Sequence, residues 1–275
     1  MTTVDNARRQ VILASRALAA AGQGDMVWGH IAVRDPQGRG IWIKAPGWGL
    51  EEVREDRVQL VSFEGEVLAG TGTPHKECPI HLELLRARPE LACSVHTHAR
   101  GAVSFAALGA PLLAVSHQGA LFGGADVPRF GVTGGLVTTP ELGRQLAAAV
   151  GDAPAALMPK HGLVAAGSTV GTAVMHAVLL EQACRIQLDA MAAGEVTVHS
   201  DQAEALAKRA QCWPAGQLET GWRYWLRKSA DLPEPPDWDD GDYRPQAAPS
   251  NGVLRPPSDR GPFPLIHALC SVIQV

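Results

Sequence analysis

A histidine-rich stretch of the sequence contains the residue types that metal chemistry needs. Residues 74–100 have the sequence PHKECPIHLELLRARPELACSVHTHAR, with four histidines around a short apolar segment that Lys76 and Glu77 directly precede. Residues i and i+2 of a β-strand project to the same side, so the VHTH run would present His96 and His98 on one face. Two imidazoles placed in this way lie within reach of one metal ion. The alternative is that both are polar strand residues that face the solvent.

Two further residues fit such a site. His161 precedes Gly162 in the segment MPKHGLVAAG, where a tight turn would let it supply a third imidazole. Glu77 could be a fourth ligand or a base. Three histidines and an open position are typical of a catalytic divalent site, whereas four protein ligands close a structural one. Imidazoles accept zinc, manganese, iron and cobalt alike, so the expected cofactor is one divalent ion of this group per chain.

The overall composition is that of a globular protein. Of the 275 residues, 46% are hydrophobic, which is enough to bury a substantial core. The formal net charge of -4, without a block of basic residues, argues against nucleic acid or an anionic membrane as a partner. No apolar run approaches the roughly 18 residues of a membrane span, and the first residues have the pattern of a helix rather than a signal peptide. Five cysteines without a CxxC pair are typical of reduced thiols, so we expect a cytoplasmic protein.

Hydrophobic periodicity predicts interleaved strands and helices down to about residue 195. Alternation on either side of DPQGRG predicts a β-hairpin over residues 28–47, and VQLVSFEGEVLAG predicts a second hairpin that turns at Glu64 and Gly65. Helices are expected over residues 5–21, 78–89, 99–109, 142–151 and 170–194, and further strands over residues 92–98 and on both sides of a turn in 156–168. This order, without regular βαβ spacing, favours an α/β layered domain with a largely antiparallel sheet.

The chain is predicted to have three parts. Residues 1–200 form the catalytic domain, and residues 201–230 form a helical C-terminal segment. Residues 231–275 hold close to half of the chain's 20 prolines. Because proline interrupts helices and cannot occupy a central strand, this last part is expected to be an extended tail.

Several motifs together resemble the class II aldolase and adducin head-domain family. They are WGHIAVRDP, PHKECPIH, RPELACSVHTHA and KHGLVAAGSTVGTAVMHAVLLEQAC, in this order, and the resemblance covers about residues 8–190. It implies a three-layer α/β/α sandwich, commonly assembled as a homotetramer with sites between subunits. It also implies that His96, His98 and His161 bind the metal ion and that Glu77 is the catalytic acid or base.

The chain departs from the sugar-phosphate aldolases of this family where they bind phosphate. Those enzymes typically show Gly-Asn-x-Ser, Thr-Pro-Ser/Thr-Gly and Ser-Ser-Glu. This chain has Gly29-His30-Ile31-Ala32, Ala45-Pro46-Gly47-Trp48 and His75-Lys76-Glu77 in the corresponding places. We therefore expect a non-phosphorylated substrate, a small carboxylic acid with a flat or apolar body, that contacts His30, Arg34, Trp48, His75 and Lys76.

One further residue is assigned through the resemblance. His117, in VSHQGALFGG, stands where the aldolases often carry tyrosine, so it is a candidate proton donor or carboxylate contact. His81 is expected on a helix face near the site rather than as a ligand, and Cys78 as a buried thiol.

The decarboxylase relatives of the family fit these residues best. The expected function is therefore that of a metal-dependent carbon-carbon lyase, a decarboxylase of a hydroxylated aromatic or β-keto acid. A metal ion can hold the electrons that remain on a substrate oxygen when the carbon-carbon bond breaks. The alternatives are a non-haem iron oxygenase acting on an aryl-pyruvate-like acid, a retro-aldolase of a hydroxy-carbonyl compound, and a non-catalytic adducin-like binding module.

Overall fold

A seven-stranded antiparallel sheet forms the centre of the protein. The computed structural model describes residues 3–123 and 126–234, and the order of strands in their sheet is β4-β3-β2-β1-β5-β7-β6. The strands are β1 (His30–Arg34), β2 (Gly40–Lys44), β3 (Val58–Ser62), β4 (Val67–Ala69), β5 (Cys93–Thr97), β6 (Ala155–Met158) and β7 (Gly162–Gly167). Each neighbouring pair is antiparallel, which confirms the predicted sheet.

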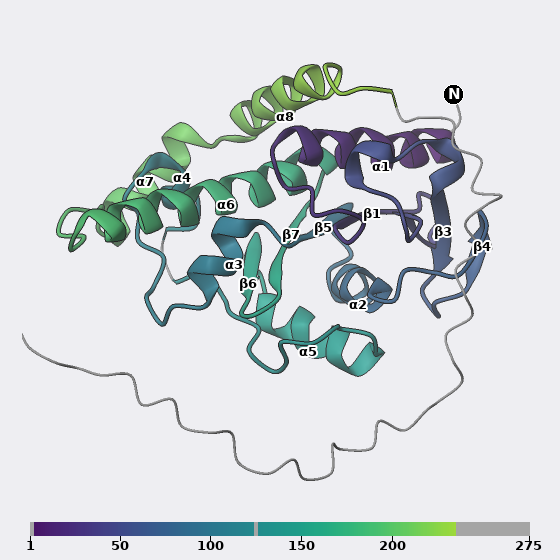
Figure 1. Ribbon diagram of the computed structural model, residues 1–275, viewed down its shortest axis with the longest axis horizontal. Coiled ribbons are helices and arrows are strands. Elements are labelled where there is room, and N and C mark those ends of the chain that lie inside the picture. Colours follow the sequence, from purple (N-terminus) through teal and green to yellow (C-terminus); the bar gives the residue numbers. More distant parts are fainter. Residues whose placement is uncertain (1–2, 124–125, 235–275) are drawn as a thin grey trace, which may run out of the picture. The chain divides into compact units, whose positions relative to one another are not determined.

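Helices cover both faces of this sheet (Figure 1). One face packs against α1 (Thr3–Ala20), α3 (Arg100–Ala106) and α6 (Val170–Ala193), and the other packs against α2 (Cys78–Ala87) and α5 (Pro140–Val150). Two hydrophobic cores result, one on each side of the sheet. The three-layer α/β/α arrangement that the sequence predicted is therefore confirmed.

Strand alternation decides which residues enter which core. In β1, Ile31 and Val33 point to the α6 side, whereas Ala32 points to the α2 side. β1 pairs with β5 so that His30 lies opposite His96 and Ala32 lies opposite Ser94. This register places the polar side chains of both strands under α2, in the middle of the sheet.

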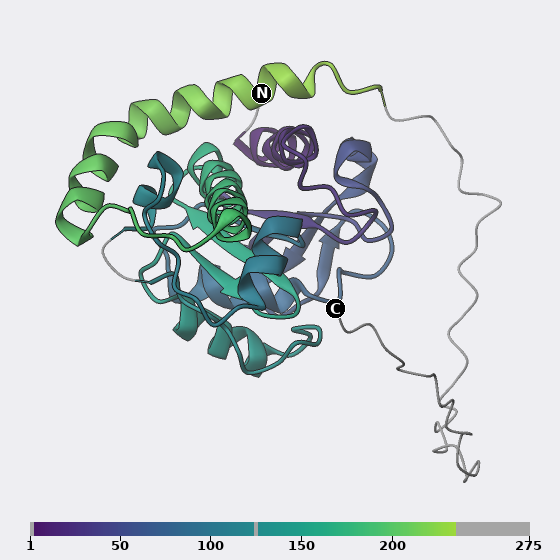
Figure 2. The same cartoon turned by 60° about the vertical axis from the view of Figure 1, so that its left-hand side comes forward.

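The last described helices pack against the body of the protein. They are α7 (Gln202–Cys212) and α8 (Ala215–Ser229), which fall within the predicted helical segment 201–230. α8 lies over α1 and α6 (Figure 2), and the ring of Trp222 packs on Gly171, where a Cβ atom would lie 2.7 Å from the ring. The boundary at residue 200 stays a prediction. The predicted tail, 231–275, lies outside the described residues from position 235 onward.

Short elements were missed by the sequence patterns. They are α4 (His117–Leu121) and the two 3-10 turns at Leu50–Glu52 and Glu55–Arg57. None of the helices within the described ranges, residues 3–123 and 126–234, is long and apolar enough to span a bilayer.

Candidate active site

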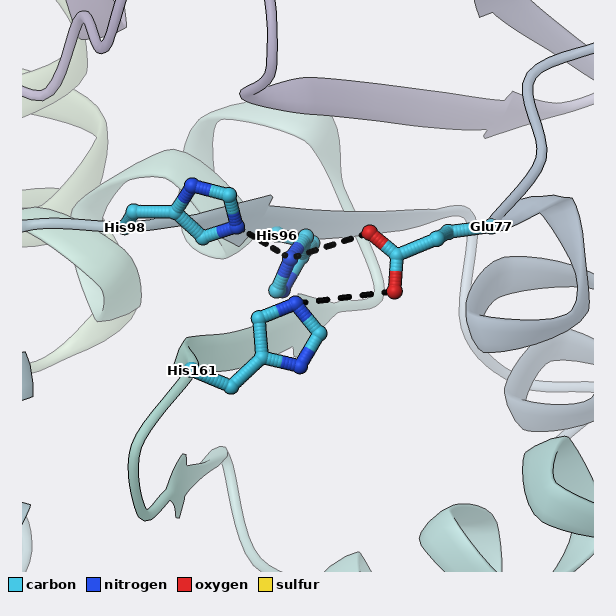
Figure 3. A group of neighbouring side chains, drawn as sticks. All are labelled: Glu77, His96, His98 and His161. Carbon is cyan, nitrogen blue, oxygen red and sulfur yellow. Dashed lines mark hydrogen bonds and ion pairs between the residues drawn. The ribbon is translucent and has the colours of Figure 1, made fainter. Parts of the chain in front are cut away.

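Three segments that are distant in sequence bring one carboxylate and three imidazoles together. Glu77 immediately precedes α2, His96 and His98 lie at the end of β5, and His161 lies in the turn between β6 and β7 (Figure 3). One ligand atom of each side chain falls within 4.8 Å of those of the other three. The His96 side chain is fully buried, those of Glu77 and His161 are nearly so, and that of His98 is partly exposed.

The turn that carries His161 is shaped by its neighbours. Lys160 adopts a positive φ of 66°, which turns the chain sharply before the histidine. Gly162 leaves no room for a side chain, because a Cβ atom there would collide with the carbonyl oxygen of Thr97 on β5. The close approach of β7 to β5 therefore requires glycine directly after His161, and this approach brings the imidazole next to His96.

Hydrogen bonds fix the orientation of two imidazoles. Nδ1 of His96 donates to the carbonyl oxygen of Leu163 at 2.9 Å, and Nδ1 of His98 donates to Oδ2 of Asp25 at 2.9 Å. In a neutral imidazole the other nitrogen is then an acceptor. The two Nε2 atoms face each other at 3.2 Å, each with a lone pair directed into the cluster. Burial lowers the pKa of His96 well below its ordinary value, so this ring is neutral at physiological pH.

Glu77 contributes a negative charge to the same cluster. Its Oε1 accepts a hydrogen bond from the backbone N–H of Val137 at 2.8 Å and lies 3.5 Å from Nε2 of His161. Burial alone would raise the pKa of this carboxyl, but the interactions with His161, His30 and His96 and the Val137 N–H outweigh it and lower the pKa well below its ordinary value. Glu77 is therefore ionised at neutral pH.

These side chains fit a divalent cation. Both ring nitrogens of His161 are buried and lack a hydrogen-bond partner among the described residues, and the Nε2 atoms of His96 and His98 face each other as acceptors. Two nitrogens bound to one ion at about 2.0–2.1 Å in tetrahedral geometry lie roughly 3.3 Å apart, close to this spacing. Asp25 and the Leu163 carbonyl hold the rings from behind, as outer partners of metal-bound histidines do.

A cavity of about 470 Å³ opens next to this cluster. Glu77 and His98 reach its wall, while His96 and His161 lie behind them. The wall is largely apolar, with an exposed indole at Trp28, and its cationic group is Lys76. The lining residues are Val27, Trp28, Pro46, Gly47, Thr73, Pro74, His75, Lys76, Glu77, His98 and Leu136.

Two of the predicted substrate-binding histidines lie one behind the other. His75 lines the cavity, and burial together with the charge of Lys44 lowers its pKa to about 4. His30 lies beneath it, with ring centroids 3.9 Å apart, and is fully buried. Nδ1 of His30 lies 2.7 Å from Nε2 of His81, and its own Nε2 lies 3.9 Å from Oε2 of Glu77. His30 is thus a neighbour of Glu77 and does not line the cavity.

Three other predicted residues do not join the cluster within one chain. The guanidinium of Arg34 donates to the carbonyl oxygens of Leu85, Arg88 and Leu91, in and just after the last turn of α2, and it does not line the cavity. Trp48 stacks under the guanidinium of Arg57, and Trp28 occupies the cavity wall in its place. His117 is exposed at the start of α4, which packs against α6 and α7.

Sequence patterns missed two polar residues near the site, the partly exposed Asp25 and the buried Lys44. Asp25 orients His98, as described above. Nζ of Lys44 donates to the carbonyl oxygens of Val27 and Trp48 at 2.8 and 2.5 Å, and so ties together the two loops that border the cavity. Burial lowers the pKa of Lys44 to about 8. His81, expected on a helix face near the site, lies on α2 next to His30 and is fully buried. A lysine at the end of the otherwise apolar run GIWIK was the one signal available for Lys44.

Comparison with known proteins assigns the family. The family model described as Class II Aldolase and Adducin N-terminal domain matches residues 9–188. The chain therefore belongs to the class II aldolase and adducin family.

The relatives include lyases of two kinds. A 3,4-dihydroxyphthalate decarboxylase from Rhodococcus jostii is 31% identical over 220 residues, which cover 74% of this chain and 88% of the relative. A 5-methylthioribulose-1-phosphate/5-deoxyribulose-1-phosphate aldolase from Rhodospirillum rubrum is 32% identical over 175 residues, with coverage of 64% and 77%. These relatives confirm the prediction of an enzyme of the lyase class.

Solved structures confirm the fold. The L-fuculose 1-phosphate aldolase from Glaciozyma antarctica superimposes with a TM-score of 0.74 at 26% identity and covers 84% of this chain and 93% of its own. An aldolase II superfamily protein from Pseudomonas syringae gives the same TM-score at 24% identity, with coverage of 83% and 94%. Class II aldolases use a divalent metal ion, and the Glu77, His96, His98 and His161 cluster offers a place for one.

Proposed function

We propose that this protein is a metal-dependent decarboxylase of a hydroxylated aromatic carboxylic acid. The observation that carries the proposal is the cavity, in which Glu77 and His98 share a wall with the indole of Trp28 and with Lys76. An aromatic and apolar wall suits a flat substrate body, and an ammonium group suits its carboxylate. Three 3,4-dihydroxyphthalate decarboxylases at 29–32% identity support the same substrate class.

The proposed metal ligands are His96, His98 and His161, with the carboxylate of Glu77 beside them. The bound ion would supply a Lewis acid that polarises the substrate's hydroxyl oxygen. Asp25 and the Leu163 carbonyl keep two of the imidazoles in the tautomer that offers Nε2 as an acceptor. Lys76 and His75, on the cavity wall, bind and orient the substrate carboxylates.

Glu77 is the proposed proton carrier. Its ionised carboxylate takes the proton of the hydroxyl group that neighbours the departing carboxylate, and returns it to the ring carbon that bears this carboxylate. The carbon-carbon bond then breaks, CO2 leaves, and the electron pair returns through the ring to the hydroxyl oxygen, which regains a proton from water. The balance is one proton consumed and one CO2 released. The lowered pKa of Glu77 keeps its carboxylate ionised, so it is able to accept a proton at the start of the reaction.

The proposal also includes the assembly and the remaining predicted residue. We infer a cytoplasmic homotetramer with sites between subunits, whose catalytic domain is residues 1–200. His117 is exposed in the single chain, so it is available to donate a proton at the site of a neighbouring subunit.

The test combines metal content with product analysis. Protein loaded with zinc, manganese, iron or cobalt is incubated with 3,4-dihydroxyphthalate, with a β-keto acid, and with L-fuculose 1-phosphate as control. We expect CO2 from the aromatic acid and no cleavage of the sugar phosphate. The His96→Ala, His98→Ala double variant should lose both the activity and the roughly one ion per chain that a three-histidine site holds.

Other outcomes would overturn the proposal in favour of a named alternative. Cleavage of the sugar phosphate without CO2 release would indicate an aldolase. Iron-dependent oxygen uptake would indicate an oxygenase. A protein that takes up none of the four metals would be a binding module rather than an enzyme.

A further inference from the structure

Three buried polar side chains form a chain that leads away from Glu77 into the core. They are His30 on β1, His81 on α2 and Ser94 on β5, and each is fully buried. Oγ of Ser94 lies 2.6 Å from Nδ1 of His81, and Nε2 of His81 lies 2.7 Å from Nδ1 of His30. Two short hydrogen bonds therefore join the sheet to α2 and end at the imidazole that faces Glu77.

The direction of these hydrogen bonds follows from counting donors. Burial lowers the pKa of His81 to about 3, so its neutral ring has one donor and one acceptor nitrogen. The Ser94 hydroxyl has His81 as its hydrogen-bond partner within residues 3–123 and 126–234, so it must donate there or leave a buried O–H unpaired. His81 then donates from Nε2 to Nδ1 of His30. The proton of His30 is thereby placed on its Nε2.

The surroundings of Glu77, at the other end of this row of hydrogen bonds, also require the proton of His30 to be on Nε2. Oε2 of Glu77 lies 3.9 Å from Nε2 of His30 and 3.9 Å from Nε2 of His96, which carries a lone pair. A lone pair on His30 as well would leave this oxygen facing two acceptors. An N–H on His30 instead offers it a donor. Nε2 of His30 is buried with no partner in hydrogen-bond range among the described residues. This is expected of a donor whose contact with the carboxylate shortens when substrate binds.

We propose that Ser94 and His81 are positioning residues that hold His30 as an Nε2–H donor toward Oε2 of Glu77. The inference rests on the proposed function, in which Glu77 carries the proton. The N–H of His30 can donate to Oε2 in both the ionised and the protonated state of Glu77, so this contact would keep the carboxyl group in one orientation throughout the transfer. Val137 holds the other oxygen.

Substitutions at His81 provide the test. His81→Gln keeps an N–H close to the position of Nε2 and should retain most of the activity. His81→Leu removes both hydrogen bonds and should lower kcat about 10- to 100-fold, as loss of an outer partner typically does, with KM and metal content unchanged. Ser94→Ala should have a smaller effect of the same kind. The matched control is His176→Leu, which removes a histidine bonded at 2.7 Å to the Ala166 carbonyl on the other side of the sheet and should leave kcat unchanged.

A spectroscopic measurement separates this inference from the proposed function. Nitrogen-15 NMR of histidine-labelled protein should show His30 as the Nε2–H tautomer in the wild type, and a changed His30 signal in His81→Leu. This readout needs no substrate, so it stands whichever acid or sugar the enzyme cleaves. The inference is overturned if His30 carries its proton on Nδ1, or if His81→Gln and His81→Leu lower kcat equally. A wild-type protein with the expected tautomer but without CO2 release would overturn the proposed function alone.

Discussion

Two buried glutamates lie on opposite faces of the sheet and have different surroundings. Glu181, on α6, accepts hydrogen bonds from the backbone N–H groups of Gly101 and Ala102 at 2.9 and 2.7 Å, in the first turn of α3. Glu77, before α2, accepts one backbone N–H, from Val137, and otherwise faces imidazole nitrogens at 3.5–3.9 Å. Both side chains are less than a tenth exposed.

The difference is in what the rest of the chain supplies to each carboxylate. The two N–H donors give each oxygen of Glu181 a hydrogen bond, Arg185 lies 3.8 Å away, and together these contacts fix a helix start, which is a structural use of a buried charge. At Glu77 the nearest nitrogen of His96 is an acceptor, so the carboxylate is complete only with a cation or a proton donor. Burial of an acidic side chain therefore does not indicate function by itself. A buried carboxylate with an incomplete set of hydrogen-bond donors does.

The largest effect is expected when the same substitution, glutamate to glutamine, is made at Glu77 rather than at Glu181. Glu77→Gln should lower kcat for CO2 release by about 10²- to 10⁴-fold, the range for loss of a general acid or base. The free energy of unfolding should change little. Steady-state kinetics and urea unfolding check this pair of outcomes, and a variant with near wild-type kcat would remove Glu77 from the mechanism.

Metal removal should affect the Glu77 cluster and not the surroundings of Glu181. An ion present at 100 to 1,000 times its Kd stabilises the folded protein by about 3–4 kcal/mol, so a chelator should lower the free energy of unfolding by that amount. The Glu181→Gln variant should lose as much on chelation as the wild type. Equal unfolding curves with and without chelator, measured in urea, would contradict a bound ion.

Lys44 is a buried charge of the opposite sign, held by two backbone carbonyls, and it sharpens the comparison through pH. Its pKa of about 8 in the folded protein lies below the ordinary 10.5. Below about pH 8 the amine is charged in both states, and burying the charged form lowers the free energy of unfolding. Between pH 8 and 10.5 the unfolded chain binds more protons, and stability rises with pH. Relative to Lys44→Met, the wild type should gain about 3 kcal/mol over this window in urea unfolding. A flat difference would show that burial leaves the amine unperturbed.

The smallest effect is expected at the structural acid. Glu181→Gln keeps one acceptor oxygen and loses the charge, so it should lower the free energy of unfolding by about 1–2 kcal/mol. Metal content and KM should equal those of the wild type, as measured by elemental analysis and kinetics. A loss of metal in this variant would show that the start of α3, which follows His98 closely, also positions the cluster.

Much of the fold was predictable because its signals are local. Strand alternation and helical periodicity located the seven strands and most helices, and DPQGRG and Glu64-Gly65 marked the hairpin turns correctly. α4 was missed because five residues are too short to show a period. The 3-10 turns were missed for the same reason.

The cluster was predictable where it depends on the alternation of side chains along a strand. His96 and His98 share a face because they are two positions apart, and Gly162 marks the turn that carries His161. Arg34 shows the limit of that rule. It shares a face of β1 with His30, but four residues along a strand span roughly 13 Å, so it reaches the opposite end of α2. Asp25, Lys44 and His81 acquire their roles through contacts between elements that no local pattern encodes.

The pairing of β1 with β5, which sets His30 opposite His96, also has a consequence for folding kinetics. No single hairpin contains the cluster, since its members come from the residue before α2, the end of β5 and the turn before β7. Pairings of such high sequence separation form late, because the loop they close must be ordered first. An ion that binds the finished cluster is then absent from the folding transition state. It should slow unfolding without speeding folding, so the ion governs how long a folded molecule lasts rather than how quickly one is made.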